Sequence, residues 1–119
     1  MNVQKKKIIF VDVDGTICQN RDDLRDQDIS IAYSDVKPYH DRISQINALY
    51  DDGHEIVYWT ARGCKSGDDY TELTKQQFLE WGVKYHDLQV GNKPHFDMYI
   101  CDKSFNSESF FHYRERGLP

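Results

Sequence analysis

Apolar residues along this chain fall into short unbroken runs and into longer stripes with helical spacing. The short runs predict four strands, at residues 7–13, 55–60, 85–90 and 97–101. The stripes predict three helices, at residues 38–50, 71–81 and 106–116. Gly53 and Gly82 follow the first two helices, where a glycine commonly ends a helix. Because strands and helices alternate, we predict an α/β fold with a three-layer, doubly wound, Rossmann-like and mostly parallel sheet.

The stretch between the first strand and the first helix is polar and acidic. Residues 17–37 lack helical spacing, and we expect them to pass over the strand ends, with a short hairpin around residues 29–33. Internal repeats and low-complexity segments are not evident. At 119 residues the chain has the length of one domain, so we predict a single domain over residues 1–119.

Composition restricts the environment and the partners. Charged residues make up 29% of the chain and the formal net charge is −5, which argues against a nucleic-acid partner. Cys18, Cys64 and Cys101 are odd in number and lack the spacing of a metal site, which favours a reducing cytoplasm. The apolar runs are too short for a membrane span and do not resemble a signal peptide. We therefore expect a cytoplasmic globular protein.

Polar side chains follow the predicted strands. Asp12 and Asp14 end the first strand, and two carboxylates this close repel each other unless a cation or a proton lies between them. Thr60 ends the second strand, Lys93 follows the third, and Asp102 follows the fourth. The carboxyl ends of parallel strands lie at one edge of a sheet, where open α/β folds bind their ligands. We predict that these five residues converge there.

Such a set of carboxylates, a hydroxyl and an ammonium suits a phosphate held against a divalent cation. Mg²⁺ binds oxygen ligands, commonly one or two carboxylates with substrate phosphate, and lysine binds phosphate oxygens as a point charge. Arg62 lies two residues after Thr60, so it is a further candidate for binding the substrate phosphate. The alternative, an ordinary surface arginine, stays open.

The stretch Asp12-Val13-Asp14-Gly15-Thr16 resembles the first signature of the haloacid dehalogenase (HAD) superfamily of phosphotransferases. Thr60, Lys93 and Asp102 resemble its second, third and fourth motifs, so the resemblance covers residues 8 to about 111. Residues 91–94 and 99–103 are also similar to a small bacterial group of capsule-biosynthesis phosphatases.

This resemblance implies a Mg²⁺-dependent phosphomonoesterase acting on a small phosphorylated metabolite such as a sugar phosphate. Asp12 would be the nucleophile that forms an aspartyl-phosphate, and Asp14 would protonate the leaving oxygen and then deprotonate the hydrolytic water. Asp12, the backbone carbonyl of Asp14, and Asp102 would hold Mg²⁺. Thr60 and Lys93 would hold the phosphoryl oxygens.

Two features depart from many members of the superfamily. A second acid often lies near the fourth strand end, where this chain has Cys101 and Asn106, and either of them is a candidate replacement. Cap domains are inserted after the first or the third strand, but residues 17–37 are too few for a domain and residues 90–93 leave no room. The resemblance therefore implies a capless core with an open site, which a second subunit of a homo-oligomer could cover.

Two other functions stay open. A signalling receiver domain has a similar length and also uses an aspartate, a threonine and a lysine. However, it accepts phosphate at the end of its middle strand, and no aspartate ends the second or third strand here. Some nucleic-acid end phosphatases use the same core, but the acidic composition and the lack of a basic groove argue against this function.

Overall fold

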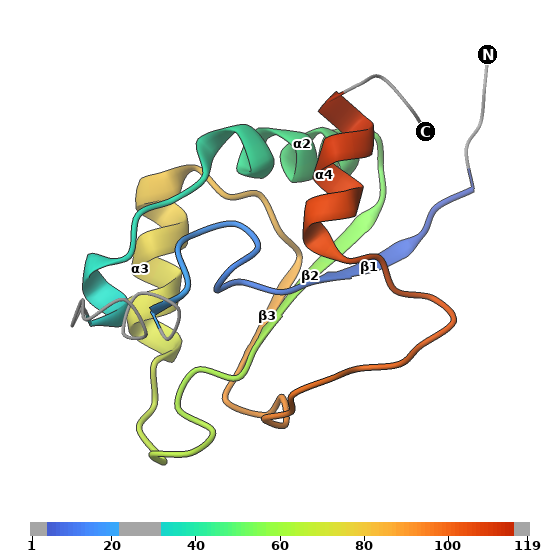
Figure 1. The fold of residues 1–119 in the computed structure, drawn as a ribbon. Helices are drawn as coiled ribbons and strands as arrows, with labels where there is room; N and C mark the ends of the chain where they lie inside the picture. The colour runs from blue at the N-terminus through green and yellow to red at the C-terminus, as the bar shows by residue number, and fades with distance from the viewer. Residues whose placement is uncertain (1–4, 22–31, 116–119) are drawn as a thin grey trace.

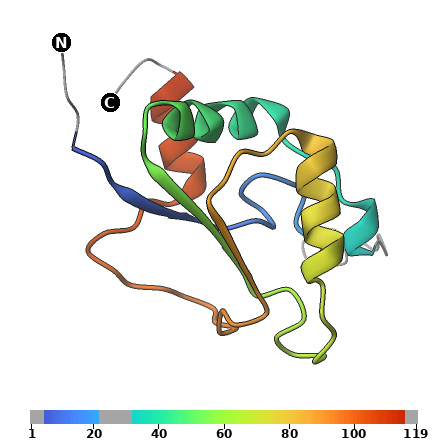
Figure 2. The ribbon, with the colours of Figure 1, turned by 180° about the vertical axis from the view of Figure 1, so that it is seen from behind.

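The computed structural model describes residues 5–21 and 32–115 of the chain. The strands are β1 (Ile8–Val11), β2 (Glu55–Thr60) and β3 (Asp87–Val90), and the helices are the short 3-10 helix η1 (Tyr33–Asp35), α2 (His40–Asp51), α3 (Thr71–Trp81) and α4 (Ser107–Glu115). Figures 1 and 2 show their arrangement from two opposite sides. The first three predicted strands and the three predicted helices are confirmed. The hairpin predicted around residues 29–33 falls largely outside the described residues.

The three strands form a parallel sheet in the order β1-β2-β3. The central strand β2 is rich in β-branched and aromatic residues, and Ile56, Val57 and Tyr58 are all buried, as expected for a strand that has neighbours on both edges. Successive parallel strands connected by right-handed crossovers place the connecting helices on one face when the strand order runs in one direction. Helices α2 and α3 accordingly lie on the same side of the sheet and contribute to one core (Figures 1 and 2).

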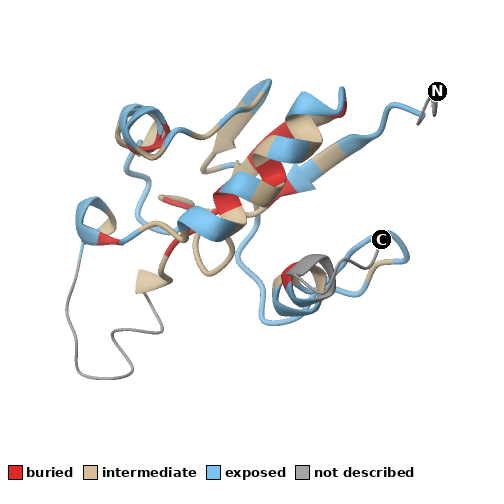
Figure 3. Cartoon of the chain, turned by 90° about the horizontal axis from the view of Figure 1, so that it is seen from above, coloured by how far each residue is buried: buried red, intermediate tan, exposed pale blue. Residues whose placement is uncertain are grey.

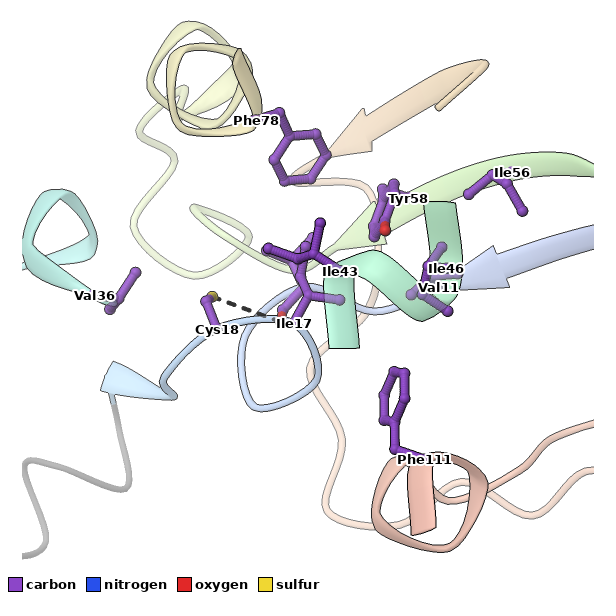
Figure 4. Close-up of a cluster of buried hydrophobic side chains, with 11 residues drawn as sticks. Val11, Ile17, Cys18, Val36, Ile43, Ile46, Ile56, Tyr58, Phe78 and Phe111 are labelled. Carbon is purple, nitrogen blue, oxygen red and sulfur yellow. Dashed lines mark hydrogen bonds between the residues drawn. The ribbon is translucent and has the colours of Figure 1, made fainter. Parts of the chain in front are cut away.

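One hydrophobic core holds the helices and the sheet together. Its buried side chains come from strands β1 and β2 and from all three α-helices, and include Val11, Ile43, Ile46, Ile56, Tyr58, Phe78 and Phe111 (Figure 4). Figure 3 shows the buried positions gathered where the helices meet the sheet. On the opposite face of β1, Ile8 is 66% and Phe10 is 54% exposed.

This arrangement corrects the predicted three-layer architecture. In the described part of the chain, α2, α3 and α4 all contribute to the same core, so the structure has two layers rather than three. The strand order does not reverse within this sheet, and a reversal is what carries crossover helices to the second face of a doubly wound fold. The parallel α/β character is confirmed. None of the described helices has the length and apolar character needed to cross a membrane.

The strand predicted at residues 97–101 is wrong. This stretch lies within the long segment 91–106 between β3 and α4, which arches away from the sheet and contains no strand (Figure 1). Met98 is 76% and Ile100 is 89% exposed. Parallel pairing needs a crossover of about a dozen residues or more, and residues 91–96 provide only six. The apolar pattern is that of a strand, but the connection is too short for parallel pairing.

A buried hydroxyl in the core gives a prediction about stability. Tyr58 is fully buried, its hydroxyl has no hydrogen-bond partner among the described residues, and burial raises its pKa. Tyr58→Phe is therefore expected to raise the free energy of unfolding by about 1 kcal/mol at neutral pH. Above about pH 10 the unfolded state loses the tyrosine proton while the folded state retains it, so wild-type stability falls with pH. Urea unfolding between pH 7 and pH 11 should show a weaker fall for the variant, and a destabilised variant would contradict this account.

Candidate functional site

Asp12 and Asp14 lie in a tight turn that follows β1. Val13 between them is completely buried, so the two aspartates flank an anchored residue. The turn closes through the N–H of Gly15, which donates to the Cys18 carbonyl at 2.9 Å, and Gly15 has a φ of +80° that favours glycine. The side chain of Asp12 is 41% exposed and that of Asp14 is 17% exposed. The more accessible carboxylate is therefore Asp12.

Asp12 forms an ion pair with Lys93. The Lys93 ammonium lies 3.0 Å from Asp12 Oδ1, although the two residues are 81 positions apart in the sequence. The Lys93 side chain is 16% exposed, and its ammonium lies 5.6 Å from the centre of the Trp59 ring and 5.7 Å from that of Phe96. Thr16 Oγ1 donates to Asp12 Oδ2 at 3.4 Å. The predicted meeting of Asp12 and Lys93 at one edge of the sheet is confirmed.

Asp14 is paired with Arg62. Arg62 Nη2 lies 2.8 Å from Asp14 Oδ1, and Arg62 Nε lies 3.0 Å from Asp14 Oδ2. This is a two-point contact between a guanidinium and a carboxylate, the strongest kind of ion pair in proteins. The Arg62 side chain is 0% exposed. The prediction that Arg62 binds the substrate phosphate is therefore wrong in this structure, because a wholly buried side chain does not reach a ligand.

Helix α3 holds the far side of the Arg62 guanidinium. Arg62 Nη1 donates to Thr74 Oγ1 at 3.2 Å and to Gln77 Oε1 at 2.5 Å, and Gln77 Nε2 donates to the Tyr33 carbonyl at 2.7 Å. The Arg62 guanidinium also lies 4.9 Å from the centre of the Tyr33 ring. Burial acts to lower the pKa of Arg62, but the hydrogen bonds and the charge of Asp14 outweigh it, so that the pKa lies above its ordinary value. Arg62 is thus a buried, permanently charged group.

The sequence reasoning missed Thr74 and Gln77. Both are buried, and they lie one turn apart on the side of α3 that also buries Phe78. The available signal was a pair of polar residues on the apolar stripe of a predicted helix. A buried polar pair of this kind calls for a partner inside the molecule, and Arg62 is that partner.

Thr60 lies where it was predicted, at the carboxyl end of β2. Its side chain is buried, and Oγ1 accepts a hydrogen bond from the Arg62 backbone N–H at 3.2 Å. Its carbonyl accepts the N–H of Gly91 at 2.9 Å, which ties the ends of β2 and β3 together. Thr60 therefore shapes the start of the Arg62 loop, and its predicted contact with a phosphoryl oxygen stays a prediction.

Cys18 completes the surroundings of Asp14. The thiol is completely buried and donates to Asp14 Oδ1 at 3.5 Å. It also donates to the Val13 carbonyl at 3.7 Å, the dashed line from Cys18 in Figure 4. Burial raises the pKa of the Cys18 thiol, and the negative charge of Asp14 raises it further. A thiol held protonated in this way is a poor nucleophile. Its role in this structure is to donate to Asp14.

Asp102 is not brought to the other carboxylates. It is exposed on the segment 91–106, where its nearest recorded partner is the Cys101 thiol, 3.9 Å from Asp102 Oδ1. Across the described ranges, no three His, Cys, Asp or Glu side chains form a group that could hold a metal ion. The predicted set of Asp12, Asp14 and Asp102 is therefore not assembled in this structure.

Asn106, a predicted substitute for a second acid, has a different role. Its Oδ1 accepts the backbone N–H of Glu108 at 3.0 Å, directly before the first residue of α4. This is the hydrogen bond of a helix N-cap, which satisfies an N–H that has no partner within the helix. Asn106 therefore caps α4.

The comparisons with known proteins bear on the fold. The crystal structure of an MCSG target protein from Vibrio cholerae is similar to this chain, with a TM-score of 0.72 and 25% sequence identity over 88% of this chain and 87% of that one. No family model and no curated protein matches the sequence. The comparison supports the small α/β architecture and carries no information about activity.

Proposed function

We propose that this chain is a Mg²⁺-dependent phosphomonoesterase with a HAD-like core, and that it acts through an aspartyl-phosphate at Asp12. The ion pair between Asp12 and Lys93 carries the proposal. It combines an accessible carboxylate at the carboxyl end of a parallel strand with a cation from the end of a distant one, which are the groups that a phosphoryl transfer site needs. The ordered motifs of the sequence support the same conclusion.

The proposed reaction uses the two aspartates in turn. A carboxylate oxygen of Asp12 attacks phosphorus, the bond to the leaving oxygen breaks, and a proton on the Asp14 carboxyl group moves to that oxygen. A water molecule then attacks the phosphorus of the aspartyl-phosphate while Asp14 accepts its proton, which releases inorganic phosphate and restores Asp12. Lys93 offsets negative charge on the phosphoryl oxygens throughout.

Part of the predicted metal site fits Mg²⁺. The carboxylate of Asp12 and the backbone carbonyl of Asp14 are oxygen donors of the kind that this ion prefers, and substrate phosphate and water commonly supply its remaining ligands. Asp102 does not fit in this structure, because it lies on the exposed segment 91–106. When bound, Mg²⁺ would stabilise negative charge on the phosphoryl oxygens.

The substrate class follows from the surroundings of Asp12. Its side chain is 41% exposed, and the sequence has no room for a cap domain after β3. The open site can therefore accept esters with a bulky group attached to the phosphate. The net charge of −5 disfavours a polyanionic nucleic acid. We therefore propose a small phosphorylated metabolite, such as a sugar phosphate.

Phosphate release from a panel of phosphorylated metabolites and from 4-nitrophenyl phosphate tests this proposal. Turnover is expected with Mg²⁺ and is expected to fall by about 100-fold or more when EDTA removes the ion. Restoring Mg²⁺ should restore the rate. A folded sample that releases no phosphate from any ester, or that works equally well in EDTA, would refute the proposal.

A further inference from the structure

We propose that Arg62 is a positioning residue for proton transfer, which contacts both oxygens of Asp14 and fixes the orientation of the carboxylate, so that Oδ2, which the Cys18 thiol does not contact, carries and transfers the proton. The inference rests on the proposed function, since it assigns a task to one atom of the proposed acid and base. The observation that carries it is the unequal distribution of donors around the two carboxylate oxygens of Asp14.

Three donors surround Oδ1 of Asp14. Arg62 Nη2 lies at 2.8 Å, Arg62 Nε at 3.2 Å and Cys18 Sγ at 3.5 Å. Among the described residues, Oδ2 accepts from Arg62 Nε, at 3.0 Å. This one N–H is shared by the two oxygens and lies closer to Oδ2, so the Cys18 thiol is what makes the distribution unequal. A carboxylate oxygen accepts about two hydrogen bonds in its plane, so Oδ1 has no lone pair left for a proton, whereas Oδ2 has one. The asymmetry selects Oδ2 as the oxygen that exchanges a proton with the leaving group and with water.

The guanidinium can impose this orientation because it is itself immobilised. Thr74 and Gln77 of α3 accept from its Nη1, and the ring of Tyr33 lies against it. A planar group held at both ends fixes the rotation of the Asp14 carboxylate as well as its position. Lysine would provide one contact point and leave that rotation free. The identity of residue 62 as arginine thus controls which oxygen is presented.

The burial of Arg62 distinguishes a positioning role from direct binding of the substrate. Because the Arg62 side chain is 0% exposed, any effect of Arg62 on the reaction acts through Asp14 rather than through contact with an ester. Loss of Arg62 should therefore impair protonation of the leaving group. It should leave the attack by Asp12 intact.

Two aryl phosphates distinguish these steps. Phenyl phosphate needs protonation of its leaving oxygen, whereas 2,4-dinitrophenyl phosphate has a leaving group stable enough to depart as an anion. For Arg62→Lys, kcat/KM is expected to fall by about 30-fold or more on phenyl phosphate and by less than about 3-fold on 2,4-dinitrophenyl phosphate. Asp14→Asn should show the same selective loss. The double variant should lose little more on phenyl phosphate than Asp14→Asn alone, because both changes impair one step.

A second arginine provides the matched control. Arg42 is also ion-paired, with Glu108 at 2.8 Å, but it lies on α2 and does not contact Asp14. Arg42→Lys is expected to change kcat/KM by the same factor on both esters. If Arg62→Lys proves unstable, Gln77→Met removes one acceptor of the guanidinium and should give the same selective pattern at smaller size.

The outcomes separate the two proposals. Equal losses on both esters for Arg62→Lys, or no loss on either, would overturn the role of Arg62 while the phosphatase proposal stands. A folded wild-type protein that hydrolyses neither ester in Mg²⁺ would refute the phosphatase proposal and this inference with it.

Discussion

Asp12→Asn is expected to lower kcat for phosphate-ester hydrolysis by about 10⁴-fold or more, because it removes the nucleophile and no neighbouring carboxylate among the described residues can replace it. Asp14 is held by Arg62 through contacts of 2.8 to 3.2 Å and is not free to swing toward the phosphorus atom. The fold should survive, since Asp12 is 41% exposed and an ion pair of that exposure contributes about 1 kcal/mol or less. Steady-state kinetics together with urea unfolding measure both effects.

Asp51→Asn is the matched control for this variant. Asp51 on α2 is also paired with a lysine, Lys84, at 2.8 Å, so the substitution removes the same charge from the same kind of pair outside the site. Its kcat is expected to stay within about 2-fold of the wild-type value. If Asp12→Asn retained turnover similar to that of Asp51→Asn, Asp12 could not be the nucleophile.

Arg62→Met is expected to lower the free energy of unfolding by about 3–5 kcal/mol, because it leaves the Asp14 carboxylate without its partner in a largely buried position. The Asp14 side chain is only 17% exposed, so water replaces the guanidinium poorly. Thr74 and Gln77 also lose the donor that satisfies their buried oxygens. A loss of this size is a large part of the stability of a small domain. Urea unfolding at neutral pH measures it.

Two comparisons make this stability prediction specific. Arg42→Met breaks an ion pair whose partner, Glu108, is 73% exposed, so it is expected to cost clearly less than Arg62→Met. Adding Asp14→Asn to Arg62→Met should recover part of the lost stability, because the unpaired charge is then gone. An Arg62→Met variant no less stable than Arg42→Met would show that the buried pair does not stabilise the fold.

Local periodicity predicted most of the elements. The bounds of β2 and α3 agree with those predicted from their apolar patterns, because both are decided by which side chains face the core. Residues 97–101 carry an equally good strand pattern, yet they form no strand. The reason is the length of the connection from β3, which is too short for residues 97–101 to pair in parallel with the sheet. The apolar pattern within a segment does not reveal the length of connection that pairing needs.

The site was predictable to the extent that it follows from strand order. Asp12 and Lys93 meet because each ends or follows a parallel strand of the same sheet. Arg62 was assigned to the wrong partner, because its burial depends on how the loop after β2 packs against Thr74 and Gln77 of α3. Spacing along the chain does not reveal such a contact. Asp102 was expected at the end of a fourth strand. Because that strand does not form, Asp102 does not reach the other carboxylates.

Trapping the covalent intermediate tests the central claim most directly. The protein, mixed with Mg²⁺ and 2,4-dinitrophenyl phosphate, is quenched in acid during turnover, and its peptides are analysed by mass spectrometry. The account predicts one phosphoryl group on the peptide that contains Asp12, labile to hydroxylamine as an acyl phosphate is, and absent from Asp12→Asn. Turnover with an unmodified Asp12, or with the phosphoryl group on another residue, would contradict it.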